Sequence, residues 1–164
     1  MNDNYVFFYR TSSPFSNWYP TKYTYNEIEF NCSEQGVMWN KAILFNDYEN
    51  AKKILKCIET EQHKMKKLGR LVKNFDNDIW NANKINIYKN HCREKFKQNE
   101  YLKQELMNTK GKILVETSPT DKIWGIGMNE KQARQTNPKE WKGLNLLGRI
   151  LTDIREEFES VIFF

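Results

Sequence analysis

The apolar positions of this chain alternate between strand-like and helix-like spacing. Short apolar runs bounded by turn formers predict β-strands at residues 6–9, 22–25, 28–31 and 113–116. The two middle runs flank Asn26 and Glu27, and they are expected to pair as a hairpin although this turn lacks a glycine.

Helical spacing begins at Ser33, which is expected to be the N-cap of a helix reaching about Phe45. Gly111 is expected to end the longest helical stretch as a turn residue. Further helices are predicted at residues 49–58, 61–72, 78–92, 95–108 and 144–158. The pattern therefore predicts an α+β fold, mostly helical with a small β-sheet, as a single domain over residues 1–164.

The length and composition fit one independently folding domain, with 164 residues of which 39% are hydrophobic. No run approaches the roughly 18 apolar residues of a membrane-spanning helix, and the polar start MNDNY lacks the pattern of a secretory signal. A cytoplasmic protein without a membrane partner is expected. The apolar tail at residues 161–164 either packs on its own domain or forms a dimer contact, so we expect a monomer or a weak dimer.

Charge and cysteine content narrow the chemistry. The formal net charge of +5 mildly favours phosphorylated ligands or nucleic acid, but it also fits a solvated Lys-rich surface. Three cysteines without a CxxC pair, Cys32, Cys57 and Cys92, argue against a disulfide framework and a structural zinc site. Neither a metal nor another cofactor is expected.

Glu34 is the most informative carboxylate, because it follows the predicted cap and opens a helix. The helix dipole and the N-terminal amides would keep it ionised, which suits a nucleophile or a cation stabiliser. The same position is also a routine place for a helix-favouring acid. Lys41 lies about two turns further along the same face, where it would contact a phosphate or point to solvent.

Asp121 lies in an irregular loop between Pro119 and Trp124, where an Asx turn is one interpretation. The other is a second catalytic carboxylate. A pair of carboxylates is typical of glycosidic bond hydrolysis, in which an oxocarbenium-like transition state is stabilised opposite a leaving group.

Several aromatic and glycine residues fall in loops or at helix starts. The aromatic rings have two interpretations: they stack on a heterocyclic ligand, or they belong to the hydrophobic core. Gly125 and Gly127 would let the backbone approach a ligand closely, but they form only a fragment of a phosphate-binding loop. The rings are Phe15, Trp18, Trp80 and Trp124.

Taken together, these segments resemble the NADAR family of YbiA-like N-glycosidases, from about Phe8 to Arg155. The resemblance is carried by the order and spacing of many short motifs. These are PFSNWYP at 14–20, SEQ at 33–35, KA at 41–42, KLGR at 67–70, Trp80, KF at 95–96, LVE at 114–116, Asp121, WGIG at 124–127 and WKGLNLLG at 141–148.

The resemblance implies hydrolysis of an N-glycosidic bond between a ribose and a nitrogenous base, without a metal or redox cofactor. It implies either a small phosphorylated N-riboside of the early riboflavin pathway or ADP-ribosylated guanine in nucleic acid as substrate. A non-catalytic module that binds ADP-ribose or a related nucleotide is the alternative.

The same resemblance assigns roles to individual residues. Glu34 is implied as the principal catalytic carboxylate, with Asp121 and Trp80 in the same site. The implied substrate-binding residues are Asn17, Trp18, Lys41, Trp124, Gly125, Gly127 and Asn145, and Arg10 and Arg70 are weaker candidates for phosphate contacts. The chain departs from the common family pattern at Gly36, where a tyrosine is usual, and this change is expected to alter which base fits.

Overall fold

The structure, a computed structural model, describes residues 4–161, so the first residues of the polar start and residues 162–164 of the apolar tail lie outside it. The chain divides into two compact units. One comprises Met1–Ser16 and Glu100–Phe164, and the other comprises Asn17–Asn99. The single domain over residues 1–164 expected from the sequence stays a prediction.

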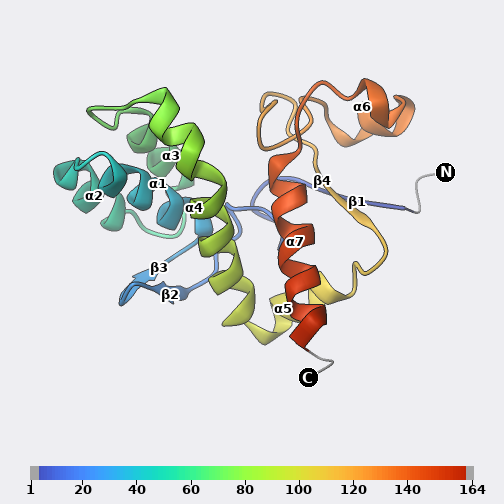
Figure 1. The fold of residues 1–164 in the computed structure, drawn as a ribbon, viewed down its shortest axis with the longest axis horizontal. Helices are drawn as coiled ribbons and strands as arrows, with labels where there is room; N and C mark the ends of the chain where they lie inside the picture. The colour runs from blue at the N-terminus through green and yellow to red at the C-terminus, as the bar shows by residue number, and fades with distance from the viewer. Residues whose placement is uncertain (1–3, 162–164) are drawn as a thin grey trace. The chain divides into compact units, whose positions relative to one another are not determined.

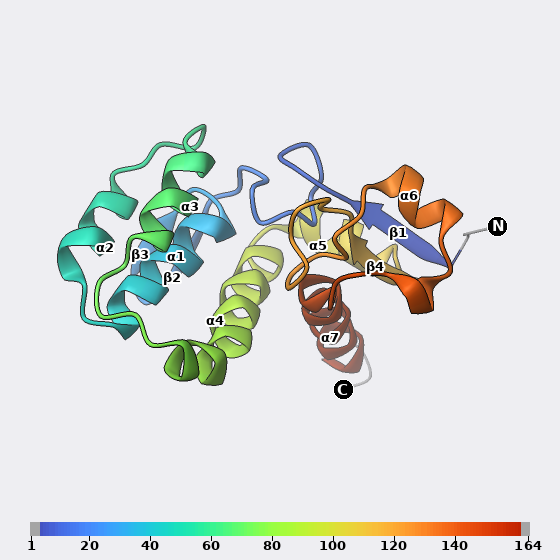
Figure 2. The ribbon, with the colours of Figure 1, turned by 90° about the horizontal axis from the view of Figure 1, so that it is seen from above.

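The unit Asn17–Asn99, called the central unit, is built around one buried helix (Figures 1 and 2). Helix α1 (Ser33–Leu44) packs against three others, α2 (Tyr48–Leu55), α3 (Gln62–Arg70) and α4 (Asn77–Lys97). Every residue of α1 from Ser33 to Met38 is buried. The first turns of α1 therefore lie in the core, where a charged side chain needs specific partners.

A hairpin of β2 (Tyr23–Tyr25) and β3 (Ile28–Phe30) completes the central unit. Its antiparallel register pairs Tyr23 with Phe30, and both side chains are buried. Asn26 and Glu27 have φ values of 51° and 64°, the left-handed conformation that a tight primed turn requires at both central positions. The predicted hairpin is confirmed, and it forms without a glycine.

The unit containing both termini, called the terminal unit, has a two-stranded parallel sheet of β1 (Tyr5–Phe8) and β4 (Ile113–Glu116). Helix α7 (Leu146–Val161) packs on β4, and α5 (Glu100–Met107) packs on α7. The face of α7 that carries Leu147, Leu151 and Ile154 is buried, as its spacing predicted. Two short helices, α6 (Glu130–Gln135) and the 3-10 helix η1 (Pro138–Glu140), follow the loop after β4.

The predicted mostly helical α+β class is confirmed, and the predicted sheet proves to be two separate two-stranded sheets. The expectation that Ser33 is the N-cap of α1 is wrong. Cys32 occupies that position without a side-chain cap, and Ser33 is the first helical residue. Helix α4 also continues to Lys97, beyond the predicted end at residue 92, and α6 was not predicted at all. Within residues 4–161, no helix combines the length and the apolar character needed to cross a bilayer.

Candidate functional site

Two backbone and side-chain contacts hold the first turn of α1 against the loop that precedes β2. Ser33 Oγ donates a hydrogen bond to Asn17 Oδ1 at 2.8 Å, and the Glu34 backbone N–H donates to the Asn17 carbonyl at 3.0 Å. All three residues are buried, and only 7% of Glu34 is exposed. Because unsatisfied N–H groups and the dipole at a helix start favour negative charge, this turn suits an ionised carboxylate.

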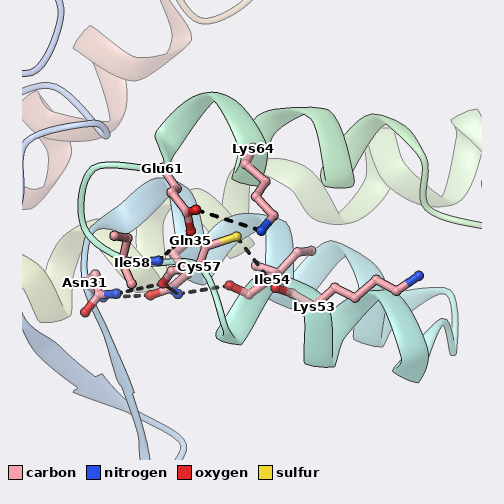
Figure 3. A network of polar contacts seen from close by, with 8 residues as sticks. All are labelled: Asn31, Gln35, Lys53, Ile54, Cys57, Ile58, Glu61 and Lys64. Atoms are coloured by element: carbon pink, nitrogen blue, oxygen red, sulfur yellow. Dashed lines mark hydrogen bonds and ion pairs between the residues drawn. The ribbon is translucent and has the colours of Figure 1, made fainter.

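The residue after Glu34 ties the same turn to the hairpin and to the end of α2 (Figure 3). Gln35 Oε1 accepts from the Asn31 N–H at 2.7 Å, and Gln35 Nε2 donates to the carbonyls of Ile54 and Cys57 at 3.0 and 3.1 Å. Asn31 Nδ2 also donates to the Cys57 carbonyl, at 3.0 Å. Glu34 thus lies between two residues whose side chains are fixed, which limits the motion of its backbone.

Asn17 keeps hydrogen-bond donors that no protein group uses. Its Oδ1 accepts from Ser33 Oγ and from Cys92 Sγ, the latter at 3.4 Å, and this sets the orientation of the carboxamide. Within residues 4–161, Asn17 Nδ2 donates no hydrogen bond. The carboxamide is therefore pre-oriented, and the substrate-binding role expected for Asn17 stays a prediction.

Lys41 connects Glu34 to two aromatic rings. Its Nζ lies 4.8 Å from the ring centre of Phe75 and 5.2 Å from that of Trp80. Burial lowers the pKa of Lys41, the charge of Glu34 opposes this by raising it, and the Arg70 charge lowers it further. The predicted residues Glu34, Lys41, Trp80 and Arg70 therefore interact within one unit. A half-buried ammonium beside a carboxylate and a guanidinium suits an anionic ligand.

The four aromatic residues named from the sequence divide between core and surface. Phe15 belongs to the core and packs edge-on against Phe8 at 5.9 Å, in the terminal unit. Trp18, Trp80 and Trp124 are each half-buried. Trp18 packs edge-on against His63 with a centroid distance of 4.7 Å. Trp18 and Trp80 are therefore partly accessible to solvent.

Lys95 is a candidate functional residue that the sequence did not single out as one. It lies on α4 and is 1% exposed. Burial lowers its pKa to about 8, while the nearby Cys92 and Cys32 raise it. Burial raises the pKa of the Cys32 thiol to about 12, and the charges of Glu34 and Lys95 act on that thiol in opposite directions. A buried lysine of this kind can exchange a proton close to neutral pH.

The space beside Gly36 is filled by the protein itself. A Cβ at this position would overlap Tyr23 Oη and His91 Nδ1, which are hydrogen-bonded to each other at 2.9 Å. His91 Nε2 lies 3.0 Å from Asn40 Oδ1, and burial lowers the pKa of His91 to about 3, so the ring is neutral. A neutral ring that donates from Nε2 to Asn40 accepts the Tyr23 hydroxyl at Nδ1. Gly36 thus makes room for a structural hydrogen-bond chain.

Asp121 forms the Asx turn that was one of its two interpretations. Its Oδ1 accepts from the backbone N–H groups of Ile123 and Trp124, both at 2.9 Å. No hydrogen bond to its second oxygen, Oδ2, occurs within residues 4–161. Asp121 lies in the terminal unit and Glu34 in the central unit, so their joint role in catalysis stays a prediction.

The glycines of the same loop serve close packing. A Cβ at Gly125 would lie 2.9 Å from the Glu116 carbonyl oxygen, and one at Gly143 would overlap Gly125 itself. Gly127 has a φ of 69°, in the region that favours glycine. These contacts give Gly125 and Gly127 structural reasons for being glycine, and their expected role in substrate binding stays a prediction.

Asn145 covers the free edge of β4. Its Oδ1 accepts from the Glu116 N–H at 3.0 Å, and its Nδ2 donates to the Leu114 carbonyl at 2.9 Å. Its expected substrate contact would have to use the remaining N–H.

Asn145 also lines a groove of about 350 Å³, which does not include Asp121 or Trp124. The residues lining this groove are Ile113, Leu114, Asn145, Gly148, Arg149, Thr152 and Asp153.

The two arginines expected near phosphate are both exposed, and they lie in different units. Arg70 ends α3, beside Lys41. Arg10 has a φ of 66°, and its guanidinium lies 5.2 Å from the ring centre of Tyr9.

Within residues 4–161, no three His, Cys, Asp or Glu side chains gather as metal ligands would.

Comparison with known proteins agrees with the resemblance seen in the sequence. The model of the NADAR domain matches residues 7–159. An N-glycosidase of Acanthamoeba polyphaga mimivirus is 42% identical over 166 residues, which cover 94% of this chain and 96% of that protein. A chloroplastic riboflavin biosynthesis protein PYRR of Zea mays is 36% identical over 83 residues, or 51% of this chain and 12% of that protein.

A solved structure confirms the expected fold. The NMR structure of the E. coli protein YbiA matches with a TM-score of 0.78 and 25% sequence identity, covering 99% of this chain and 89% of that one.

We predict that Gly36→Ala destabilises the protein, because the new methyl group would displace the Tyr23–His91 hydrogen bond. The expected loss is about 1–3 kcal/mol in the free energy of unfolding, measured by urea titration. Gly69→Ala is the matched control. It is also a helical glycine, but its Cβ would meet only the flexible side chain of Met38. Equal effects of the two substitutions would contradict the structural role of Gly36.

Proposed function

Because the chain belongs to the NADAR family, we propose that it is an N-glycosidase that hydrolyses the bond between a ribose carbon and a nitrogen of a base. The observation that carries the proposal is Glu34, a buried carboxylate at the first turn of α1, held between two anchored residues and beside the ammonium of Lys41. The enzyme is proposed to act in the cytoplasm. Its cysteines, Cys32, Cys57 and Cys92, are free and buried, as is usual in a reducing compartment.

Glu34 is proposed to stabilise the positive charge that develops at the anomeric carbon. When the bond from this carbon to nitrogen breaks, the sugar gains oxocarbenium character, and a fixed carboxylate stabilises that charge more strongly in a buried site than in water. Water then forms the new bond to the anomeric carbon, and Glu34 would align this water or accept its proton.

Lys95 is proposed to donate the proton that the leaving nitrogen needs. A leaving base departs more easily when it is protonated, and an acid with a pKa near the working pH is the most effective donor. The pKa of about 8 caused by burial gives Lys95 this property. Its position also supports the role, because Cys92 lies one turn before Lys95 on α4 and contacts Asn17, whose carbonyl accepts from Glu34.

The remaining groups of the central unit are proposed to bind the substrate. Asn17 Nδ2 would donate to a ribose hydroxyl, and Trp80 would stack on the base or cover the sugar. Lys41 and Arg70 provide two cations for a phosphate or a diphosphate. This set supports a phosphorylated N-riboside as substrate, either ADP-ribose attached to guanine in nucleic acid or a phosphorylated riboflavin intermediate.

We predict that Glu34→Gln abolishes turnover, because it removes the charge and nearly preserves the shape. The loss expected is at least about 100-fold in kcat, with binding of ADP-ribose retained. The assay follows release of the free base from an ADP-ribosylated guanine oligonucleotide and from ribosylaminopyrimidine phosphate. Equal turnover by both proteins would remove Glu34 from its role. Binding without turnover by wild type would favour a non-catalytic binding module.

We predict an alkaline limit to activity that depends on Lys95. The protonated amine is the active form, so kcat should fall as the pH rises through about 8. Lys95→Met should lower kcat about 100-fold or more and lose this pH dependence. Lys84→Met, at a partly exposed site on α4, is the control and should keep both the rate and the profile. An unchanged profile in Lys95→Met would exclude the proposed proton donor.

A further inference from the structure

One face of α3 carries a row of basic side chains. Gln62, Met65 and Gly69 are buried and face the helices against which α3 packs. On another side of α3, residues spaced three and four positions apart form the row, which we call the basic face. Its members are His63, Lys66, Lys67 and Arg70. It extends over about 10 Å at the rise of an α-helix.

The lysines and the arginine of the basic face have no ion-pair partner in the described part of the chain. Lys64, which lies beside this row, does have one, because its Nζ is 3.9 Å from Glu61 Oε1. Lys73 follows just after the helix and is also exposed and without an ion pair in the described part of the chain. The basic face therefore presents several uncompensated cations to solvent.

Aromatic rings stand at both ends of the basic face. At the start of α3, Trp18 packs against His63 at 4.7 Å, and Lys66 Nζ lies 5.9 Å from the Trp18 ring. At the end of α3, the charge of Arg70 acts on Lys41, which is held over the rings of Phe75 and Trp80. Phe75 is 46% exposed. Rings that alternate with cations in this way suit unpaired bases joined by phosphates.

Helix α3, which carries the basic face on its exposed side, packs with its other side against α1. The buried side of α3 touches the start of α1, where Met65 Sδ lies 3.6 Å from Cys32 Sγ, two residues before Glu34. A strand lying along α3 would therefore pass over the helix that is packed directly against the turn carrying Glu34.

We propose that the basic face of α3, with Trp18 at one end and Phe75 at the other, binds the backbone of a single-stranded nucleic acid. The cations contact the phosphates and the rings stack on flanking bases, so binding does not depend on the base sequence of the strand. This surface would hold a polymeric substrate near the proposed catalytic site. The connection between the basic face and Glu34 rests on the proposed function. The binding itself does not require any turnover.

The test is a titration of the full chain with a fluorescent oligodeoxythymidine of twelve nucleotides at several salt concentrations. The double variant Lys66→Gln/Lys67→Gln removes two charges from the basic face. Its affinity at low salt should fall roughly 10-fold or more, and the slope of log K against log salt should shrink by about 1.4, since each contact to a single strand contributes about 0.7.

The control is Lys52→Gln/Lys53→Gln, which removes the same charge from exposed lysines of α2. It should bind like wild type. Equal weakening by both double variants would overturn the proposal, because it would show general attraction by net charge. Wild-type binding to anionic lipid vesicles but not to the oligonucleotide would also overturn it and assign the surface to a membrane.

Turnover of the small ribosylaminopyrimidine phosphate separates this proposal from the proposed function. Lys66→Gln/Lys67→Gln should leave that rate unchanged, while Glu34→Gln should abolish it and leave oligonucleotide binding intact. If the oligonucleotide binds through the basic face and no substrate is turned over, the surface stands and the N-glycosidase assignment fails.

Discussion

The central unit depends on how the first turn of α1 is fixed. Ser33 ties this turn to Asn17, and Gln35 ties it to the hairpin and to the end of α2. These bonds are buried, so losing any one of them would leave a polar group without a partner. Glu34 lies between the two anchors, at a helix start that favours negative charge and near the ammonium group of Lys41. The same polar contacts therefore hold the fold together and position the candidate catalytic group.

The apolar periodicity and the turn-forming residues were sufficient to predict most of the helices and strands. The hairpin, α1, β4 and α7 follow directly from regular apolar spacing. Helix α6 was missed because it has six residues, too few for a periodic signal, although its capping box of Asn129 and Gln132 was visible in the sequence. Ser33 was misassigned because a serine before an acidic residue resembles an N-cap. Its hydroxyl instead bonds to Asn17, a partner distant in sequence.

The candidate site was only partly predictable, because burial decides the chemistry of several of its members. Lys95 is one of many lysines in the sequence, and only its position inside the unit lowers its pKa. Gly36 accommodates Tyr23 and His91, a contact between residues distant in sequence, and its expected effect on base recognition stays a prediction. Asp121 could be assigned to an Asx turn from local sequence alone, because the bonds that hold it are local. Residues of the same type therefore differ in role according to their surroundings.

The most direct test is to map where ADP-ribose binds by NMR on the isotope-labelled wild-type protein. If Glu34 and Trp80 belong to one binding site, the amide signal of Glu34 and the indole signal of Trp80 should shift together as the ligand is added. The indole of Trp141, which packs against Tyr5 and Phe7, serves as the internal reference and should not move. Saturable binding that leaves Glu34 and Trp80 unchanged, and instead shifts residues such as Arg149 and Thr152 of the groove in the terminal unit, would contradict the account.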